Sequence, residues 1–253
     1  MTESKRIYRE LKQDIVTCTL APGLSISEQE MCERYRASRT PVREACRKLC
    51  EESLMQMIPF RGYSIPQLTI EEYRNLRELQ TAVDPAVAAL AAERATPAQI
   101  KEMEGWASYE YNVGQRNSYY TFLEWNRNLH ICIAAATRNQ VYLDIVMNVQ
   151  TRLMRYFYQV IVMDGYGPEL VAEHHDLVRA IKSGNTELAR QRAEEHLTHT
   201  ARRSANIDLR SVNYGIDGLV NPLGNEWPPE NVANPRPKIN KRPPMRRRKL
   251  LSR

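Results

Sequence analysis

Two helix start signals stand eleven residues apart near the beginning of the chain, and this spacing restricts how the region can fold. The Ser-Glu-Gln-Glu segment at 27–30 matches a capping box, in which the serine and the last glutamate satisfy each other's free backbone amides. Ser38 or Thr40 can cap the next helix, and Pro41 is tolerated in its first turn because amides there lack helical partners. The sequence therefore predicts two short helices joined by a tight turn.

The segments on either side complete a small unit. Apolar residues recur at helical spacing from Ile7 to Val16, before a Pro-Gly turn. Beyond the second short helix the pattern becomes that of two short strands, 54–58 and 63–65, around a turn at 59–62. Three helices closed by a β-hairpin describe a winged helix-turn-helix, in which the third helix enters the major groove of DNA.

The second part of the chain is helical almost throughout. Capping boxes at 69–72 and 96–99 begin two of its helices, and Gly184 suits a left-handed helix end. Pro85 should kink or split the first of them, because proline lacks an amide and crowds the preceding turn. The helices are expected at 71–94, 97–115, 119–137, 140–162, 169–183 and 186–205.

These patterns predict a mainly α protein, with an N-terminal winged helix-turn-helix that includes a small β-hairpin, followed by an all-helical bundle. The expected parts are a winged-helix domain at 1–68, a helical domain at 69–207 and a Pro-rich basic tail at 208–253. No apolar run approaches the ~20 residues that cross a bilayer, and the polar first residues are not typical of a signal peptide. The five cysteines, an odd number, favour reduced thiols and a cytoplasmic protein.

The net charge of +6 suggests a nucleic-acid partner, but its excess lies at one end of the chain. From residue 221 onward nine lysines and arginines stand against two glutamates, whereas residues 1–68 carry +2 and residues 69–220 carry −3. The Pro-rich tail lacks helical periodicity, so we expect it to be disordered. It is either an arm attracted to DNA phosphates or a solvated extension without a dedicated role.

One segment identifies a family. Residues 38–45 read Ser-Arg-Thr-Pro-Val-Arg-Glu-Ala and, with the Pro-Gly turn at 22–23 and the Pro-Phe-Arg-Gly turn at 59–62, resemble the GntR family of bacterial transcription regulators. The resemblance implies that Arg39 and Arg43 are the main DNA contacts, since a guanidinium can pair with guanine or clamp phosphate. The full set of implied DNA-binding residues is Ser38, Arg39, Thr40, Arg43, Arg61 and Gly62.

Three residues depart from the family pattern in this region. Gln29 stands where arginine is common, which weakens one expected phosphate contact. Arg36 and Ser53 occupy positions often held by glycine, and a left-handed conformation at a non-glycine residue costs on the order of 1 kcal/mol. Gly62 fits the wing glycine that lets the backbone approach DNA closely.

The histidines form a second pattern, since all five lie between residues 130 and 199. Asn126 and His130 share one helix face, while His174 and His196 lie on two later helices. Three helices can therefore direct imidazoles into one bundle core, which is how helical bundles build metal sites. The alternative is that scattered histidines cap helices, pair with acids or lie on the surface.

Residues 72–203 resemble the FCD ligand-sensing domain of the FadR subfamily. The resemblance implies a divalent metal, zinc or nickel, held by Asn126, His130, His174 and His196, with open positions for a small organic-acid effector. Asn126 replaces the usual aspartate, and its neutral amide is a poorer ligand for a dication. Arg77 and Arg152 are the candidate effector-binding residues, although Arg152 can equally be a surface salt-bridge partner.

We therefore expect a cytoplasmic homodimer that binds a double-stranded DNA operator as a ligand-responsive repressor, with no membrane partner and no enzymatic activity. Two heads on a pseudo-palindrome are needed because one helix-turn-helix reads only a few base pairs. Two alternatives remain at this point. One is a metal-dependent hydrolase with a DNA-binding appendage. The other is a regulator whose second domain only dimerises.

Overall fold

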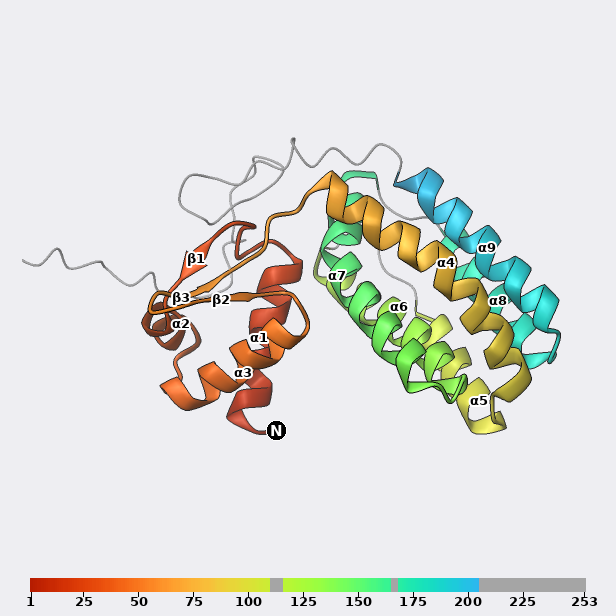
Figure 1. Ribbon diagram of the computed structural model, residues 1–253, viewed down its shortest axis with the longest axis horizontal. Coiled ribbons are helices and arrows are strands. Elements are labelled where there is room, and N and C mark those ends of the chain that lie inside the picture. Colours follow the sequence, from red (N-terminus) through yellow and green to blue (C-terminus); the bar gives the residue numbers. More distant parts are fainter. Residues whose placement is uncertain (110–115, 165–167, 205–253) are drawn as a thin grey trace, which may run out of the picture.

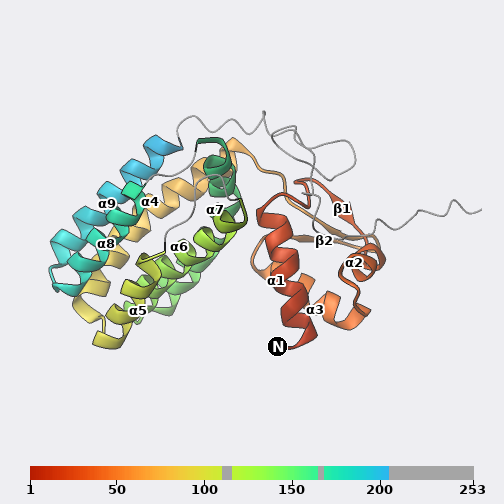
Figure 2. The ribbon, with the colours of Figure 1, turned by 180° about the vertical axis from the view of Figure 1, so that it is seen from behind.

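The computed structural model describes residues 1–109, 116–164 and 168–204, and the predicted basic tail lies outside the described residues. Figure 1 shows two parts joined by one extended segment that leads into α4 (Ile70–Arg94). The first part contains the strands and three helices, and the second is entirely helical, as the sequence predicts. Figure 2 shows the same division from behind.

The first part is a winged helix-turn-helix. Its elements in chain order are α1 (Glu3–Val16), β1 (Ser25–Ile26), α2 (Glu28–Tyr35), α3 (Arg39–Glu51), β2 (Gln56–Ile58) and β3 (Gly62–Ser64). The strands form an antiparallel sheet in the order β1-β3-β2, so the predicted hairpin is present together with a third strand that was not predicted. A strand of two residues is too short to show the alternation by which strands are recognised.

The start signals of the two short helices act as expected. Ser27 and Glu30 form the reciprocal capping box of α2. The same helix ends at Arg36, which adopts the left-handed conformation at φ 50°. Ser38 is the N-cap of α3, but its side chain makes no capping hydrogen bond. Its hydroxyl is therefore not committed to holding the helix end.

Gly62 has a packing role within the winged-helix domain that the sequence did not indicate. Its φ of +112° favours glycine, and a Cβ atom there would lie 2.5 Å from the Ile26 carbonyl oxygen and 2.8 Å from the Ser27 Cα. The glycine therefore allows β3 to pack against the backbone of β1 and the start of α2.

In the residues that the structure describes, the second part contains six helices that run side by side (Figures 1 and 2). They are α4 (Ile70–Arg94), α5 (Pro97–Ala107), α6 (Arg116–Ala136), α7 (Gln140–Asp164), α8 (Pro168–Lys182) and α9 (Thr186–Arg203). Of the two effects expected of Pro85, a split of the first helix is wrong, because α4 continues through it, whereas a kink stays a prediction. Packing of α4 against α6, α7, α8 and α9 supports the helix across the proline. The expected helix at 97–115 is also too long, since α5 ends at Ala107.

The capping box predicted at 69–72 is only half formed. The Thr69 side chain accepts a hydrogen bond from the Glu72 amide, but Glu72 turns its carboxylate toward α7. There Glu72 accepts hydrogen bonds from Arg152 at 2.6 Å and from the Tyr156 hydroxyl at 2.7 Å. Tyr156 in turn accepts one from the Thr69 amide. The start of α4 is thus fixed by tertiary contacts.

Direct contacts join the two parts along α1 and the extended segment. The buried Lys12 ammonium lies 3.2 Å from Glu52 in the winged-helix domain and 3.9 Å from Glu124 on α6. Gln159 of α7 donates to the Cys18 sulfur, and Arg155 donates to the Pro66 carbonyl. Among the described residues, no helix combines the length and apolar character needed to cross a membrane.

Replacing Gly62 with alanine is expected to lower the free energy of unfolding of the winged-helix domain by about 2 kcal/mol, because it combines a positive φ with a backbone clash. Gly105 is a matched control, since a Cβ there meets no atom within 4 Å. Gly105→Ala should stabilise α5 by up to about 1 kcal/mol. Urea denaturation of both variants measures the difference, and equal stability of the two would contradict the packing role of Gly62.

Candidate DNA-binding surface and metal centre

The amino end of α3 is open to solvent. Ser38, Arg39, Thr40 and Arg43 are all exposed there, and the first turn of the helix contains no acidic residue. The unpaired amides at a helix start favour an anion such as phosphate. Four of the six predicted DNA-binding residues therefore lie together on one accessible helix end.

Arg43 has a partner in the absence of DNA. Its Nε donates to Glu28 at 2.8 Å, and this hydrogen bond holds the pKa of the Glu28 carboxyl below its usual range. The Arg43 side chain is nevertheless 59% exposed. Glu28 therefore directs the guanidinium without enclosing it, and the sequence pattern gave no sign of this pair.

The wing lies beside the same surface. Gly62, which pairs with Ile58 next to the hairpin turn, packs against Ser27, the residue before Glu28, so the turn end of the hairpin is close to the partner of Arg43. Arg61 is exposed in the turn between β2 and β3. Phe60, next to it, is fully exposed and has a φ of 62°. The structure thus places the predicted residues Arg61 and Gly62 next to an uncovered aromatic side chain that sequence reasoning did not single out.

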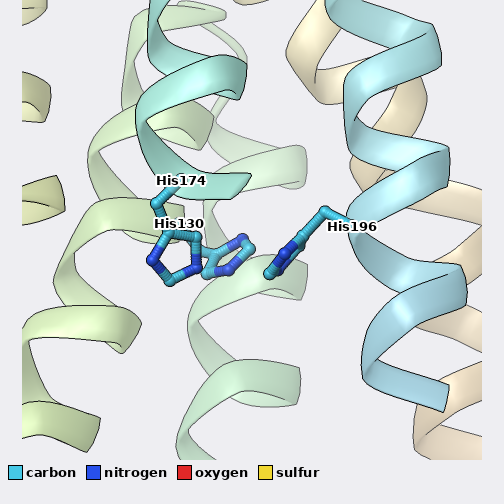
Figure 3. A group of neighbouring side chains, drawn as sticks. All are labelled: His130, His174 and His196. Carbon is cyan, nitrogen blue, oxygen red and sulfur yellow. The ribbon is translucent and has the colours of Figure 1, made fainter. Parts of the chain in front are cut away.

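Three histidines converge in the helical domain. His130 comes from α6, His174 from α8 and His196 from α9, and one ring nitrogen of each lies within 4.8 Å of the others (Figure 3). All three rings are buried. Burial lowers the pKa of each ring, that of His130 to about 3, with the neighbouring His196 as the second cause. The imidazoles are therefore neutral at pH 7 and have lone pairs suited to a metal ion.

Glu173 orients one of these rings. Burial raises the pKa of the Glu173 carboxyl, but hydrogen bonds from Arg203 and His196 prevail and lower it to about 2. An ionised carboxylate only accepts hydrogen bonds, so the His196 Nδ1 donates to Glu173 at 3.0 Å. Its Nε2 is then left with the lone pair, which is the usual effect of a carboxylate behind a ligating histidine. His199 also contacts Glu173, at 2.9 Å.

His174 provides the test of whether these residues fit a metal. Its Nε2 is buried and makes no hydrogen bond to any described residue. An unpaired buried polar nitrogen costs free energy, which coordination of an ion would remove. The donor set of three neutral imidazoles suits zinc or nickel. The residues therefore fit a divalent transition metal.

A cavity adjoins the histidines on the α7 side. It encloses about 330 Å³, open solvent at its mouth included, and His130, His196, Asn126 and Arg77 contribute to its lining. Asn126 thus faces the same space as two of the histidines, one turn from His130. Arg77 is buried, donates to the Leu197 carbonyl at 2.8 Å and is hydrogen-bonded to Gln80.

Arg152 lies elsewhere. It is not among the residues that line this cavity, and its guanidinium pairs with Glu72 on α4. The structure therefore brings together Arg77, Asn126, His130, His174 and His196 but does not bring Arg152 to them. This location agrees with the alternative role of Arg152 as a salt-bridge partner.

Asp84 is the residue near the histidines that sequence reasoning missed. Its Oδ2 lies 3.6 Å from the His130 Nδ1, and the side-chain amides of Gln80 and Gln150 donate to the same oxygen at 3.0 Å and 3.4 Å. Burial raises the pKa of the Asp84 carboxyl to about 6. The available signal was a lone acidic residue within the most apolar stretch of a predicted helix.

A winged helix joined to a histidine-centred helical bundle defines a DNA-binding transcription regulator with an attached second domain. Residues 3–65 match the model of bacterial regulatory proteins of the gntR family, and residues 75–199 match the FCD domain. The chain is 30% identical to the HTH-type transcriptional repressor RspR of Escherichia coli K12, over 77% of this chain and 85% of that protein. It is 23% identical to the galactonate operon transcriptional repressor of Escherichia coli K12, over 82% and 99% of the two chains. The chain therefore belongs to the GntR family and carries an FCD domain.

Solved structures show the same fold. Escherichia coli McbR/YncC superposes with a TM-score of 0.61 at 17% identity, covering 81% of this chain and 98% of that one. A GntR transcriptional regulator from Rhodococcus sp. RHA1 gives a TM-score of 0.61 at 22% identity, covering 82% and 100%. The matched families and the similar proteins are transcription regulators and not enzymes, which overturns the hydrolase alternative.

Glu173→Gln is expected to weaken zinc binding by about 10- to 100-fold, because the neutral amide no longer fixes the protonation of His196. Competition with a chromophoric chelator measures the affinity. Glu187→Gln is the control. Glu187 is exposed on the same helix as His196 and precedes it by more than two helical turns. Wild-type affinity in Glu173→Gln would show that the carboxylate has no orienting role.

Proposed function

We propose that the protein is a dimeric, ligand-responsive repressor whose operator binding is modulated by a small carboxylate metabolite held at a metal centre in the FCD domain. The observation that carries the proposal is the group of three neutral, buried imidazoles beside a cavity that also contains Arg77. A metal ion at the histidines and the guanidinium of Arg77 would both attract the negatively charged carboxylate of an effector in this cavity. As a regulator of chromosomal operators, it acts in the cytoplasm.

The DNA contacts come from α3 and the wing. Arg39 and Arg43 read or clamp the DNA in the major groove, and Ser38 and Thr40 bond phosphate oxygens. Arg61 and Gly62 follow the neighbouring backbone or minor groove. The exposure of the α3 start, with a Ser38 hydroxyl that makes no capping bond, supports this assignment.

The metal centre consists of His130, His174 and His196, with Asn126 as the fourth candidate at the cavity wall. A zinc or nickel ion bound there supplies an open, positively charged position for an oxygen of the effector. Arg77 holds the effector carboxylate from α4, since it lines the same cavity. Arg152 does not line this cavity and instead fixes Glu72 at the start of α4.

Regulation requires that the effector bind two dimer arrangements with different affinities. The helix α6 contributes Asn126 and His130 to the cavity and Glu124 to the contact with Lys12 of α1. A shift of α6 on effector binding therefore reaches the winged-helix domain directly. The names of RspR and of the galactonate operon repressor support repression as the direction of control.

Arg43→Ala is expected to lower operator affinity by about 10-fold or more, since a bidentate base contact contributes roughly 1–3 kcal/mol of discrimination. Arg47→Ala, one turn further along α3, is the control with a similarly exposed arginine and should change affinity much less. The operator is first selected from a pool of genomic fragments. Gel-shift titrations then compare the variants, and equal effects of the two substitutions would refute a specific contact by Arg43.

Removal of metal by a chelator is expected to lower the melting temperature, and zinc or nickel should restore it, because an ion that binds only the folded state stabilises it. A His174→Ala variant should lose this response. A melting temperature that neither chelator nor metal changes would favour the alternative in which the second domain only dimerises. Titration of small carboxylates into the protein–operator mixture tests the effector, and an unchanged operator affinity with all of them would sink the proposal.

A further inference from the structure

We propose that Phe60, at the tip of the wing, enters the minor groove of the operator and wedges between two stacked base pairs. The wedge rests on the proposed function, since it extends the DNA-binding surface of α3 and the wing. It adds an apolar contact to a predicted set of polar residues and glycine. Recognition by such a wedge depends on how easily a base step unstacks, and it needs no hydrogen bond to a base.

The exposure of Phe60 sets it apart from the other phenylalanines. The chain has three of them. Phe122 and Phe157 are 2% and 6% exposed and belong to the core, whereas Phe60 is 108% exposed. Its ring stays in water until a partner covers it. Single apolar side chains are common on protein surfaces, so a second observation is needed to identify a binding role.

The backbone at Phe60 provides that observation. The Arg61 amide donates to the Ile58 carbonyl at 3.1 Å, which closes a four-residue turn with Pro59 in second place and Phe60 in third. Phe60 has a φ of 62°. A proline followed by a residue of positive φ is typical of a type II turn, whose third position favours glycine. A bulky aromatic residue there strains the backbone, and such strain is typical of positions that serve binding rather than folding.

The location of the wing tip suits DNA. Arg61 follows Phe60 and is exposed, so a guanidinium that attracts phosphate lies next to the ring in the chain. Gly62, at the turn end of the hairpin, packs against Ser27 at the start of α2, and the next residue of α2 binds Arg43 (Figure 1). The wing tip therefore lies near the exposed start of α3. Proteins that bind the minor groove often combine arginine with an apolar wedge.

The size of the exposed apolar group also favours DNA over a protein partner. A stable protein interface buries about 1,200–2,000 Å² and needs a broad face, whereas the gap between two base pairs accepts a single apolar side chain. The hairpin that carries the ring is braced, because β3 pairs with β1 and β2 on its two sides. Insertion of the ring therefore costs little ordering entropy.

The first experiment compares full-length wild-type protein with Phe60→Gly. Glycine suits the turn, so urea denaturation should show equal or greater stability of the variant. Gel-shift titration should nevertheless show operator binding weakened about 10-fold, because the contact between the ring and the bases is lost. A ring that only supports the fold would give lower stability and unchanged affinity, and that pattern would overturn the proposal.

Two further variants test the chemistry of the side chain. Phe60→Leu keeps an apolar wedge and should stay within about threefold of the wild-type affinity. Met57→Ala is the matched control, since Met57 is 64% exposed on β2 of the same hairpin but lies away from the tip. It should change the affinity by less than about twofold. Equal losses in Phe60→Gly and Met57→Ala would show a general contact of the hairpin and would contradict the wedge.

Unstacking of a base step can be detected directly. A fluorescent adenine analogue that brightens when it leaves the base stack is placed at successive positions of the operator. Wild-type protein should raise its fluorescence at one step of each half-site, and Phe60→Gly should not. Replacing that step by a stiffer A-tract step should weaken binding of the wild type but not of the variant. Identical fluorescence with both proteins at every position would overturn the proposal.

Failure of the DNA-binding surface itself looks different. If Arg43→Ala and Phe60→Gly both bind the operator like wild type, the proposed surface and the wedge are wrong together. If Arg43→Ala loses binding and Phe60→Gly retains full affinity, the surface stands and only the role of Phe60 is wrong. Sedimentation without DNA tests a second copy as the partner. A variant Phe60→Gly that changes self-association but keeps its operator affinity would overturn the proposal.

Discussion

The burial of three uncharged imidazoles at one point is the constraint on which the arrangement of the helical domain depends. Each ring comes from a different helix. The ring nitrogens can lie close together only if α6, α8 and α9 keep one position along their axes and one rotation relative to one another. Burial keeps the rings neutral, and the ion pair of Glu173 with Arg203 orients the one from α9. An unpaired buried nitrogen such as the His174 Nε2 costs free energy in an apolar bundle, and a bound ion would recover that cost.

The features that follow from local chemistry could be predicted from the sequence. Each of these features depends on a few neighbouring residues: the capping box at α2, the left-handed Arg36 and the helix starts near 70, 97, 140 and 186. The positions of the histidines on three separate helices likewise predicted that three imidazoles could meet in the bundle core. The two-residue strand β1 could not be predicted, since it exists only through pairing with β3. Asp84 was missed for a similar reason, because its significance arises from residues 46 and 66 positions away in the chain.

The errors have tertiary causes. Proline disfavours a helix by its local geometry, yet α4 continues through Pro85 because four other helices pack against it. Glu72 does not complete its capping box because Arg152 and Tyr156 offer it stronger partners on α7. In both cases the local rule was sound, and contacts between distant segments outweighed it.

The buried Lys12 has a consequence for engineering. Its ammonium pairs with Glu52 of its own domain and lies near Glu124 of the other. The boundary between the two parts is therefore a buried interface to which both domains contribute. A chimera that joins this winged-helix domain to the helical domain of a relative must therefore keep both sides of the interface. The residues of α6 and α7 that face α1 have to be transferred together with α1. A cut chosen only by domain boundary would leave a charged amine buried against foreign side chains, and the resulting fusion would lose stability before its ligand response could be measured.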